Sequence, residues 1–304
     1  MMKKIHLVLF LISFNFNLLN LFAQTINDRQ LKTPFALKYA VDAITIKDLE
    51  NDLRQLQDLS STEKINLLQL EIKKIKNSHS NSYCDSRVLS LGNLKALYVF
   101  PKNNKKQNIL AITYLNNPQN KNEIFGADEI NSGVVALKKL AIMSCQLPLI
   151  RPISVIFSEL DRKNLLTQLE EPLTDLYLWL EVFEIGHDSL RSDQLKKYYN
   201  RAYFSNQTNQ QNAWANLLKE RSYSSIFRRL NEEEWKKHRL FVNTSELELK
   251  KIPFLFLTND YINDPNNKLG TKNDFVETIN MNSFHDTVKS LNNFVLSLGL
   301  DIVK

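Results

Sequence analysis

The chain has 304 residues and a formal net charge of +6, with lysine, arginine and acidic residues dispersed along its length. Its basic clusters at residues 102–106 and 236–239 are short and typical of solvated turns or helix faces, so we expect no nucleic-acid partner. The length suits one large domain.

The N-terminus predicts an export signal. Lys3 and Lys4 precede an apolar segment at residues 5–22, and the small residue Ala23 stands just before Gln24. This order is typical of a cleaved signal peptide, whereas the polar interruptions of the apolar segment disfavour a permanent membrane span. We therefore predict a signal peptide at residues 1–23 and a periplasmic or secreted mature chain, residues 24–304, with no membrane span. An uncleaved membrane anchor is the alternative.

Apolar residues at helical spacing predict helices over residues 25–78. The spaced positions are Ile44, Leu49, Leu53 and Leu56, then Ile65, Leu68, Leu70, Ile72 and Ile75. Between the two groups, Ser60 to Glu63 form a polar step with an acidic residue, which predicts a helix N-cap.

Apolar runs farther along predict strands at residues 96–100, 109–114, 153–157 and 254–257, with another apolar run at 175–185. The polar residues 102–106 predict a hairpin between the first two strands. We expect helices at residues 134–143 and 284–298, and a helical insertion without strands near residues 190–240. This alternation predicts a single α/β domain, with a central mixed, mostly parallel sheet flanked by helices on both faces.

The expected insertion is rich in aromatic residues, which have two interpretations: a recognition surface, or the core of a helical subdomain. These residues are Tyr198, Tyr199, Tyr203, Phe204, Trp214, Tyr223, Phe227 and Trp235. Cys84 and Cys145 are the only cysteines. An oxidising compartment would permit a disulfide between them, and two buried thiols are the alternative.

Residues 126–133 read GADEINSG and lead into the predicted helix at 134–143. This segment resembles the GADDNASG turn of the zinc aminopeptidase and glutaminyl-cyclase family, in which the second acidic residue bridges two zinc ions. Segments similar to other parts of that family follow the family's order, at residues 93–117, 152–161, 179–186 and 269–280. The resemblance covers roughly residues 93–293, with an unaligned stretch near 192–244, and implies a zinc-exopeptidase-like fold.

Carried over residue by residue, the resemblance retains few metal-binding side chains. The bridging position falls on Glu129, with Asp128 beside it, and one ligand carboxylate falls on Asp161. The other family positions have lost their ligand or base type: Thr113 and Leu115 at the His-x-Asp motif, Leu160 at the general base, Phe183 at the fourth ligand and Gly270 at the last histidine. A small shift of register would bring Glu181 or Glu184 to the fourth position.

Two zinc ions need imidazole and carboxylate ligands, and a separate base must take the proton from the zinc-bound water. We therefore expect no cofactor and a catalytically inactive binding or interaction module, with peptide or protein N-termini as candidate ligands. The relict metal-site candidates are Glu129, Asp161, Asp128, Glu184 and His187, with Glu129 and Asp161 expected to face one cleft.

The alternative is an active zinc-dependent exopeptidase or glutaminyl cyclase with altered ligands, in which Asp128, Glu129, Asp161 and His187 hold the metal. His238 and His285 are weaker candidates for substitute ligands. Ser132, Ser158 and His187 supply nucleophile and base types for another kind of enzyme, but their spacing matches no motif.

Overall fold

The fold is given by a computed structural model. It describes residues 34–78, 83–102, 107–115, 127–147, 149–169, 175–183, 185–186, 200–204, 209–222, 227–237, 244–259 and 276–301. The predicted signal peptide at residues 1–23 lies outside these ranges. Within them, no helix combines the length and apolar character needed to cross a membrane.

Three helices open the described chain: α2 (Pro34–Asp42), α3 (Ile46–Gln57) and α4 (Ser61–Ser78). The predicted N-cap is confirmed, because the Ser60 N–H donates to the Glu63 carboxylate at 2.8 Å and the Glu63 N–H donates to Ser60 Oγ at 3.4 Å. The prediction that Leu70 belongs to the apolar stripe is wrong. Its side chain is 56% exposed, because it lies two residues from the buried Leu68 and Ile72 and so faces the opposite side of α4.

Eight described strands form one mixed sheet in the order β1-β2-β4-β3-β5-β8-β6-β7. Their bounds are β1 (Cys84–Leu91), β2 (Leu94–Pro101), β3 (Asn108–Tyr114), β4 (Ile153–Ser158), β5 (Leu176–Val182), β6 (Asn200–Phe204), β7 (Phe227–Arg229) and β8 (Phe254–Asn259). Strands β4, β3, β5 and β8 are parallel neighbours in the middle of the sheet. The four strands predicted with definite bounds are confirmed as β2, β3, β4 and β8.

The predicted hairpin between β2 and β3 is wrong. β4 lies between these two strands, antiparallel to β2 and parallel to β3. The hairpin is formed instead by β1 and β2, whose register pairs Leu91 with Leu94 across a two-residue turn. Gly92 opens this turn with a φ of 60°, a backbone conformation that favours glycine in hairpin turns.

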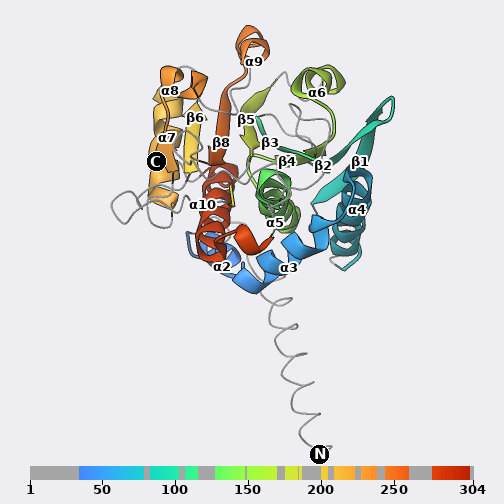
Figure 1. Cartoon of the computed structure of the whole chain (residues 1–304). Helices are drawn as coiled ribbons and strands as arrows, with labels where there is room; N and C mark the ends of the chain where they lie inside the picture. Colours follow the sequence, from blue (N-terminus) through green and yellow to red (C-terminus); the bar gives the residue numbers. More distant parts are fainter. Residues whose placement is uncertain are drawn as a thin grey trace, which may run out of the picture.

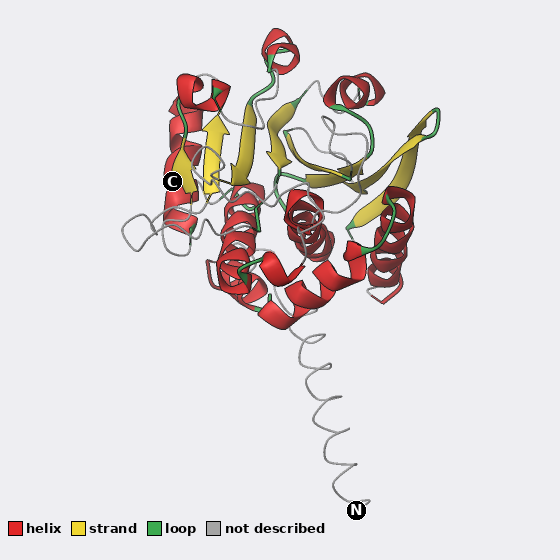
Figure 2. Cartoon of the chain, viewed as in Figure 1, coloured by secondary structure: helices red, strands yellow, loops and turns green. Residues whose placement is uncertain are grey.

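Helices cover both faces of the sheet (Figures 1 and 2), as predicted. The other α-helices of the described residues are α5 (Gly133–Gln146), α6 (Arg162–Gln168), α7 (Asn209–Arg221), α8 (Glu232–Lys236), α9 (Ser245–Leu249) and α10 (Met281–Gly299). One core, here the α5-side core, packs α2, α3, α4, α5, α7 and α10 against the sheet through residues such as Leu53, Val134 and Phe294. The opposite α6-side core packs α6, α8 and α9 through residues such as Leu165, Trp235 and Leu247.

The expected helical insertion near residues 190–240 is wrong in part, because its described residues include β6 and β7 as well as α7 and α8. β6 pairs antiparallel with β8 and extends the main sheet. Aromatic side chains of this region are buried rather than displayed: Phe204, Trp214, Phe227 and Trp235 are all at most 8% exposed. Tyr198, Tyr199 and Tyr223 lie outside the described residues. The recognition-surface interpretation therefore fails for these four residues, whereas Tyr203 is half-buried and stacks on Trp235.

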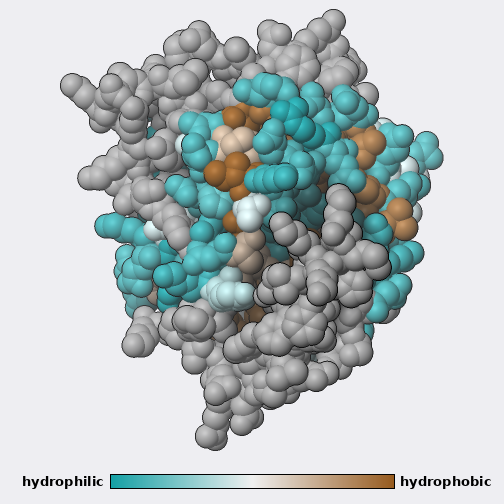
Figure 3. Space-filling view, turned by 90° about the horizontal axis from the view of Figure 1, so that it is seen from below, coloured by the Kyte–Doolittle hydropathy of each residue, from teal (hydrophilic) through white to brown (hydrophobic). Residues whose placement is uncertain are grey.

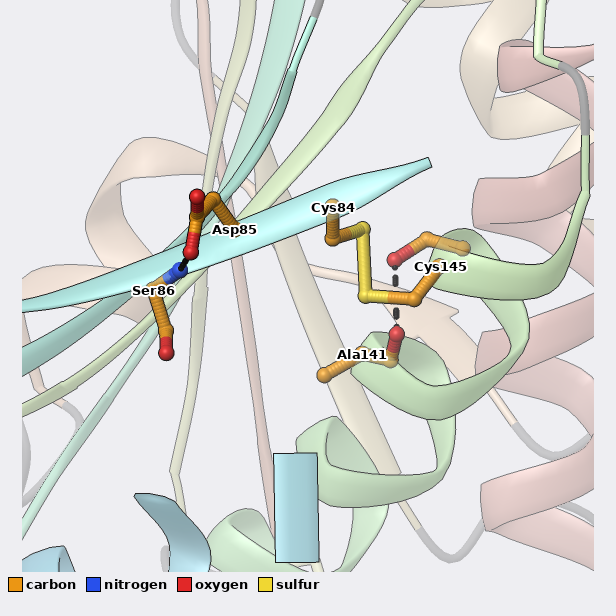
Figure 4. The surroundings of a disulfide bond; sticks show 6 residues. Cys84, Asp85, Ser86, Ala141 and Cys145 are labelled. Carbon is orange, nitrogen blue, oxygen red and sulfur yellow. Dashed lines mark hydrogen bonds between the residues drawn. A yellow bond between two sulfur atoms is a disulfide. The ribbon is translucent and has the colours of Figure 1, made fainter. Parts of the chain in front are cut away.

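Cys84 and Cys145 form a disulfide, which answers the question that the sequence left open (Figure 4). The bond joins the first residue of the edge strand β1 to the last turn of α5, with Cα atoms 4.9 Å apart. Beside it, the Tyr83 N–H donates to the Cys145 carbonyl at 2.9 Å. The disulfide and this hydrogen bond hold the edge hairpin to the α5-side core.

Exposed large apolar side chains are scattered over several elements, among them Tyr39, Leu70, Leu91, Leu94 and Leu249. Seen from below, the described surface is mainly hydrophilic, with hydrophobic residues in small groups (Figure 3). Scattered apolar residues of this kind are ordinary on a folded domain and do not define a partner surface.

We expect replacement of both Cys84 and Cys145 by serine to lower the free energy of unfolding by about 4 kcal/mol, because the disulfide closes a long loop and restricts the unfolded chain. The loop spans a sequence separation of 61 residues. Denaturant unfolding of the oxidised mature protein, its reduced form and the double variant measures this. The reduced protein should match the variant, and equal stability of all three would show that the bond contributes nothing.

Candidate functional site

The carboxyl ends of the parallel strands β4, β3, β5 and β8 share one edge of the sheet, the place where open α/β sheets bind ligands. Most family ligand positions lie at this edge. Thr113 and Leu115 are at the end of β3, Leu160 and Asp161 follow β4, and Phe183 follows β5. The structure therefore brings these sequence positions to the same edge.

The first residue of α5, Gly133, lies in close contact with β3 and β5 at this edge. It follows a π-helical segment, η1 (Ala127–Ser132), of a kind often found at functional sites. A Cβ atom added to Gly133 would lie 2.6 Å from Thr113 Oγ1 and 3.0 Å from the Val182 carbonyl oxygen. Only glycine permits this approach without a shift of the Thr113 side chain and of the β5 backbone. The neighbouring Ser132 Oγ accepts a hydrogen bond from the Ile185 N–H at 3.0 Å.

Thr113 and Leu115 point to the α5 side of the sheet and are 2% and 1% exposed. Thr113 lies beneath Gly133, and Leu115 belongs to the α5-side core. The Leu115 backbone is bonded at both ends: its N–H donates to the Ser158 carbonyl at 2.8 Å, and its carbonyl accepts from Ser61 Oγ at 3.2 Å. This strand end is packed and hydrogen-bonded within the protein.

The residues after β4 form a turn and a helix cap. Leu160 is fully buried in the α6-side core. Ser158 Oγ accepts from the Leu160 N–H at 2.9 Å and donates to the Leu160 carbonyl at 2.8 Å. Both hydrogen bonds of this hydroxyl therefore stabilise the turn after β4. Asp161 is exposed, and its carboxylate accepts from the Asn164 N–H at 2.8 Å as the N-cap of α6. A carboxylate in this role stabilises the start of the helix.

Phe183 occupies the fourth ligand position with an aromatic ring in the α6-side core. It stacks on Tyr114 with ring centroids 5.7 Å apart and meets Phe256 edge-on at 6.3 Å. These contacts fill the space beside the ends of β3, β5 and β8 with apolar surface.

Glu181, two residues earlier on β5, lies on the same face of the sheet and is fully buried. Arg162 of α6 binds it through two hydrogen bonds of 2.6 Å, from Nε and Nη2 to the two carboxylate oxygens. Trp179 Nε1 and the Tyr114 hydroxyl also donate to Glu181, at 2.7 and 3.2 Å. Phe256 lies under the guanidinium, 4.8 Å from ring centroid to Cζ. We call these five residues the Glu181 network.

The electrostatics of the Glu181 network favour the charged form of Arg162 and the neutral form of Tyr114. Burial by itself lowers the pKa of the Arg162 guanidinium, but the Glu181 carboxylate outweighs this and raises that pKa above its ordinary value. Burial raises the pKa of the Tyr114 hydroxyl well above its ordinary value, and the charge of Glu181 raises it further. Tyr114 is therefore a neutral hydrogen-bond donor, and Glu181 has four donated hydrogen bonds to satisfy its charge.

The remaining sequence candidates are placed only in part. Asp128 and Glu129 lie in η1, whose backbone is described. Glu184, His187, His238 and Gly270 lie outside the described residues. His285 is remote from the edge: its Nε2 lies 2.8 Å from the Ile44 carbonyl oxygen, where α10 meets the N-terminal helices. In the part of the chain that the structure describes, no three His, Cys, Asp or Glu side chains gather as a metal site would require.

Sequence reasoning missed Arg162, Trp179 and Tyr114 as partners of Glu181. A signal was present, since a glutamate in the apolar run of β5 needs compensation when that strand is buried on both faces. Arg162 directly follows Asp161, but the sequence does not show that α6 turns it back onto β5.

Comparison with known proteins supports the fold at low sequence identity. No family model and no curated protein matches the sequence. The LapA aminopeptidase of Legionella pneumophila superposes with a TM-score of 0.70 and 12% identity, over 87% of this chain and 73% of that one. LapB of the same organism gives 0.69 and 11%, over 87% and 75%.

A glutaminyl cyclase from Macrostomum lignano gives a TM-score of 0.59 and 11% identity, over 86% of this chain and 92% of that one. The chain therefore has a fold shared by aminopeptidases and glutaminyl cyclases, as the sequence resemblance implied.

We expect Arg162→Met to lower the free energy of unfolding by about 3–5 kcal/mol, because it leaves the Glu181 carboxylate buried without its counter-charge. Lys236→Met is the control, since its pair with Glu232 has side chains 58% and 68% exposed. Water and salt screen such an exposed pair, so its loss should change stability little. Denaturant unfolding compares the two variants. Similar losses in both would show that the Glu181 network is not a major contributor to stability.

We expect Gly133→Ala to lower the free energy of unfolding by about 1–3 kcal/mol, because the added methyl overpacks the contact with Thr113 and Val182. Thr113→Ala should recover part of this loss in the double variant by removing the nearer clashing atom. A double-mutant cycle measured by thermal or denaturant unfolding tests the coupling. Strictly additive effects would mean that Gly133 and Thr113 do not share this contact.

Proposed function

We propose that the mature protein is an exported, catalytically inactive relative of zinc aminopeptidases and glutaminyl cyclases that acts as a binding or interaction module. Its candidate ligands are peptide or protein N-termini, held at the carboxyl edge of the sheet. Titration with a peptide carrying a free N-terminus, and with its acetylated form, tests this ligand class. Equal or absent binding of the two peptides would contradict it.

The observation that carries the proposal is the packing of the family ligand positions. Thr113, Leu115, Leu160 and Phe183 are each at most 9% exposed, and each has a defined place in a core layer or under α5. Of the family positions whose side chains the structure describes, Asp161 alone carries a carboxylate, which caps α6. These residues replace donor atoms with apolar groups and one hydroxyl.

Zinc ions do not fit this set of residues. Zinc favours imidazole, thiolate and carboxylate ligands in a tetrahedral arrangement, and desolvation of a dication beside leucine and phenylalanine side chains is costly. Leu160 at the general-base position has no group that can accept a proton from water. Glu181 is no substitute ligand, since its two oxygens accept four hydrogen bonds, two of them from Arg162.

The disulfide supports the exported part of the proposal. Disulfides persist in oxidising compartments and are rare in the cytosol, so the Cys84–Cys145 bond agrees with the signal-like N-terminus. In this account, residues 1–23 are removed and the mature chain works in the periplasm or outside the cell. An intact N-terminal methionine on most of the native protein, found by mass spectrometry, would contradict this part.

The alternative function is an active metal-dependent exopeptidase or glutaminyl cyclase with altered ligands. The fold shared with the LapA aminopeptidase favours it, although fold alone does not determine activity. In this alternative Asp161 would bind metal together with Asp128, Glu129 and His187. The two functions therefore assign different roles to Asp161, and this difference can be measured.

We expect the dialysed mature protein to retain less than one zinc ion per chain and to show no turnover of aminoacyl or N-terminal glutamine substrates. The physical reason is the loss of imidazole ligands and of the general base, which alone contributes about a hundred- to ten-thousand-fold in rate. Elemental analysis and the two assays, with and without a chelator, check this. Stoichiometric zinc with chelator-sensitive turnover that Glu129→Ala abolishes would establish the alternative.

Variants of Asp161 separate a helix cap from a metal ligand. Asparagine is as good an N-cap as aspartate, whereas alanine costs about 1 kcal/mol. If Asp161 only caps α6, Asp161→Asn keeps the stability of the parent protein and Asp161→Ala loses it, with metal content unchanged in both. Loss of bound metal in Asp161→Asn would instead support a ligand role.

A further inference from the structure

Three polar side chains form a row across neighbouring strands at the carboxyl edge of the sheet. In the pairing register, Thr258 near the end of β8 lies opposite Arg201 of β6, and Arg201 lies beside Arg228 of β7. β8 and β6 are adjacent in the sheet, and β7 follows β6 (Figure 1). Because paired residues project from the same face about 5 Å apart, these three side chains are direct neighbours. We call them the Arg201 row.

The Arg201 row lies on the α6 side of the sheet, as the alternation of side chains along each strand shows. Two residues away on the same faces of β6 and β8 are Tyr203 and Phe256, whose rings pack in the α6-side core with centroids 6.5 Å apart. Arg229, which follows the last member of the row, projects from the opposite face. Its Cζ lies 5.5 Å from the centroid of the Phe204 ring.

The row combines a buried hydroxyl with a buried guanidinium. Thr258 is fully buried, and its Oγ1 has no hydrogen-bond partner within the described residues. Arg201 is 6% exposed, and its contacts include a hydrogen bond of 3.4 Å from Nη1 to the Asn200 carbonyl. A guanidinium has five N–H donors, so Arg201 can serve several acceptors at once. Arg228 is exposed, and the row therefore reaches solvent at its β7 end.

Positive charge exceeds negative charge around the row. Glu234 of α8 accepts from Arg228 Nη2 through one oxygen, and through the other from the Asn231 N–H at 3.0 Å. Burial and the charge of Arg228 lower the pKa of Arg201 to about 10, although Glu234 acts in the opposite direction. Like charges on paired positions of neighbouring strands destabilise a sheet. In the described part of the chain, two guanidinium groups thus share one carboxylate.

A carboxylate fits the Arg201 row. Its two oxygens match the fork of a guanidinium, and one of them can also accept from the Thr258 hydroxyl. Its single negative charge would offset the excess positive charge of Arg201 and Arg228. A metal cation or a peptide ammonium would be repelled by the same two arginines.

We propose that Thr258, Arg201 and Arg228 form a subsite for the carboxylate group of a small molecule or peptide. The subsite goes beyond the proposed function, because it involves neither a metal position nor a peptide N-terminus. Its failure would leave the pseudoenzyme proposal intact, and zinc binding at the other strand ends would leave the subsite intact.

The test uses the full mature protein and acetate as the probe. The unfolding midpoint is measured against acetate concentration, with chloride keeping the ionic strength constant. We expect acetate to raise the midpoint by several degrees at saturation, because a ligand of the folded state stabilises it. Arg201→Met should abolish the rise. Arg228→Met should abolish most of it, and it changes an exposed residue, so the test does not depend on how well the Arg201 variant folds.

Arg229→Met is the matched control. It removes an arginine from the same strand as Arg228, but from the opposite face, where the side chain donates to Asn212 Oδ1 at 2.9 Å. This variant has the same net charge as Arg228→Met, so a general effect of charge on acetate binding would appear equally in both. We expect Arg229→Met to respond to acetate as the parent protein does.

Glu234→Gln gives an independent readout. Glutamine preserves the capping box of α8 but removes the carboxylate that shares Arg228 with the ligand. We expect the acetate concentration at half-saturation to fall by about fivefold or more. Thr258→Val should raise that concentration, because it removes the hydroxyl donor at nearly constant volume.

Acetylated dipeptides with a free or an amidated C-terminus separate the two ligand sources. A response to acetate and to the free dipeptide, without one to the amidated form, supports a peptide carboxylate. A response to acetate but to neither dipeptide supports a small free carboxylate.

No acetate response in the parent protein would overturn the proposal. An undiminished response in both Arg201→Met and Arg228→Met, or its loss in Arg229→Met, would do the same, because acetate would then act elsewhere on the protein. A Glu234→Gln variant with an unchanged half-saturation concentration would also contradict the subsite, since Glu234 competes for the same arginines.

Discussion

The close approach of α5 to the sheet is the contact on which the arrangement of the edge depends. Gly133 lies against Thr113 and the Val182 carbonyl with no room for a Cβ atom, so α5 starts directly on the ends of β3 and β5. Farther along the helix, Lys138 binds both Asp52 of α3 and Glu71 of α4, at 2.9 and 2.6 Å. The N-terminal helices are therefore positioned through α5, and α4 reaches the same edge.

Two buried polar groups on the two sides of the sheet differ in whether they have hydrogen-bond partners. On the α6 side, Glu181 is compensated by Arg162 and by two neutral donors, so the Glu181 network needs no ligand. On the α5 side, Asn131 is buried, and its side-chain amide has no hydrogen-bond partner among the described residues. A site built for zinc would concentrate ligands at one point. Here the described polar groups are divided between two core layers, with Asp161 outside both as a helix cap.

The sequence predicts those elements whose pattern is dictated by burial, namely the apolar strands β2, β3, β4 and β8 and the helices α5 and α10. It fails at β1, where the residues 84–91 alternate weakly because this edge strand is only partly buried, and at β6 and β7, which are short and rich in polar residues. The strand order also could not be predicted from the sequence, because β4 pairs between β2 and β3 although it lies far from them along the chain. The edge positions followed from ordered motifs, but the role of Asp161 as a cap and the partners of Glu181 depend on contacts that spacing does not reveal.

The central claim is that the packed side chains at Thr113, Leu115, Leu160 and Phe183 leave no place for a pair of zinc ions. Anomalous diffraction at the zinc edge, from crystals of the mature protein grown with excess zinc, tests this directly. The account predicts no anomalous peak at the carboxyl ends of β3, β4 and β5. Two peaks about 3.5–4 Å apart at that edge, the spacing of a two-metal site, would contradict it.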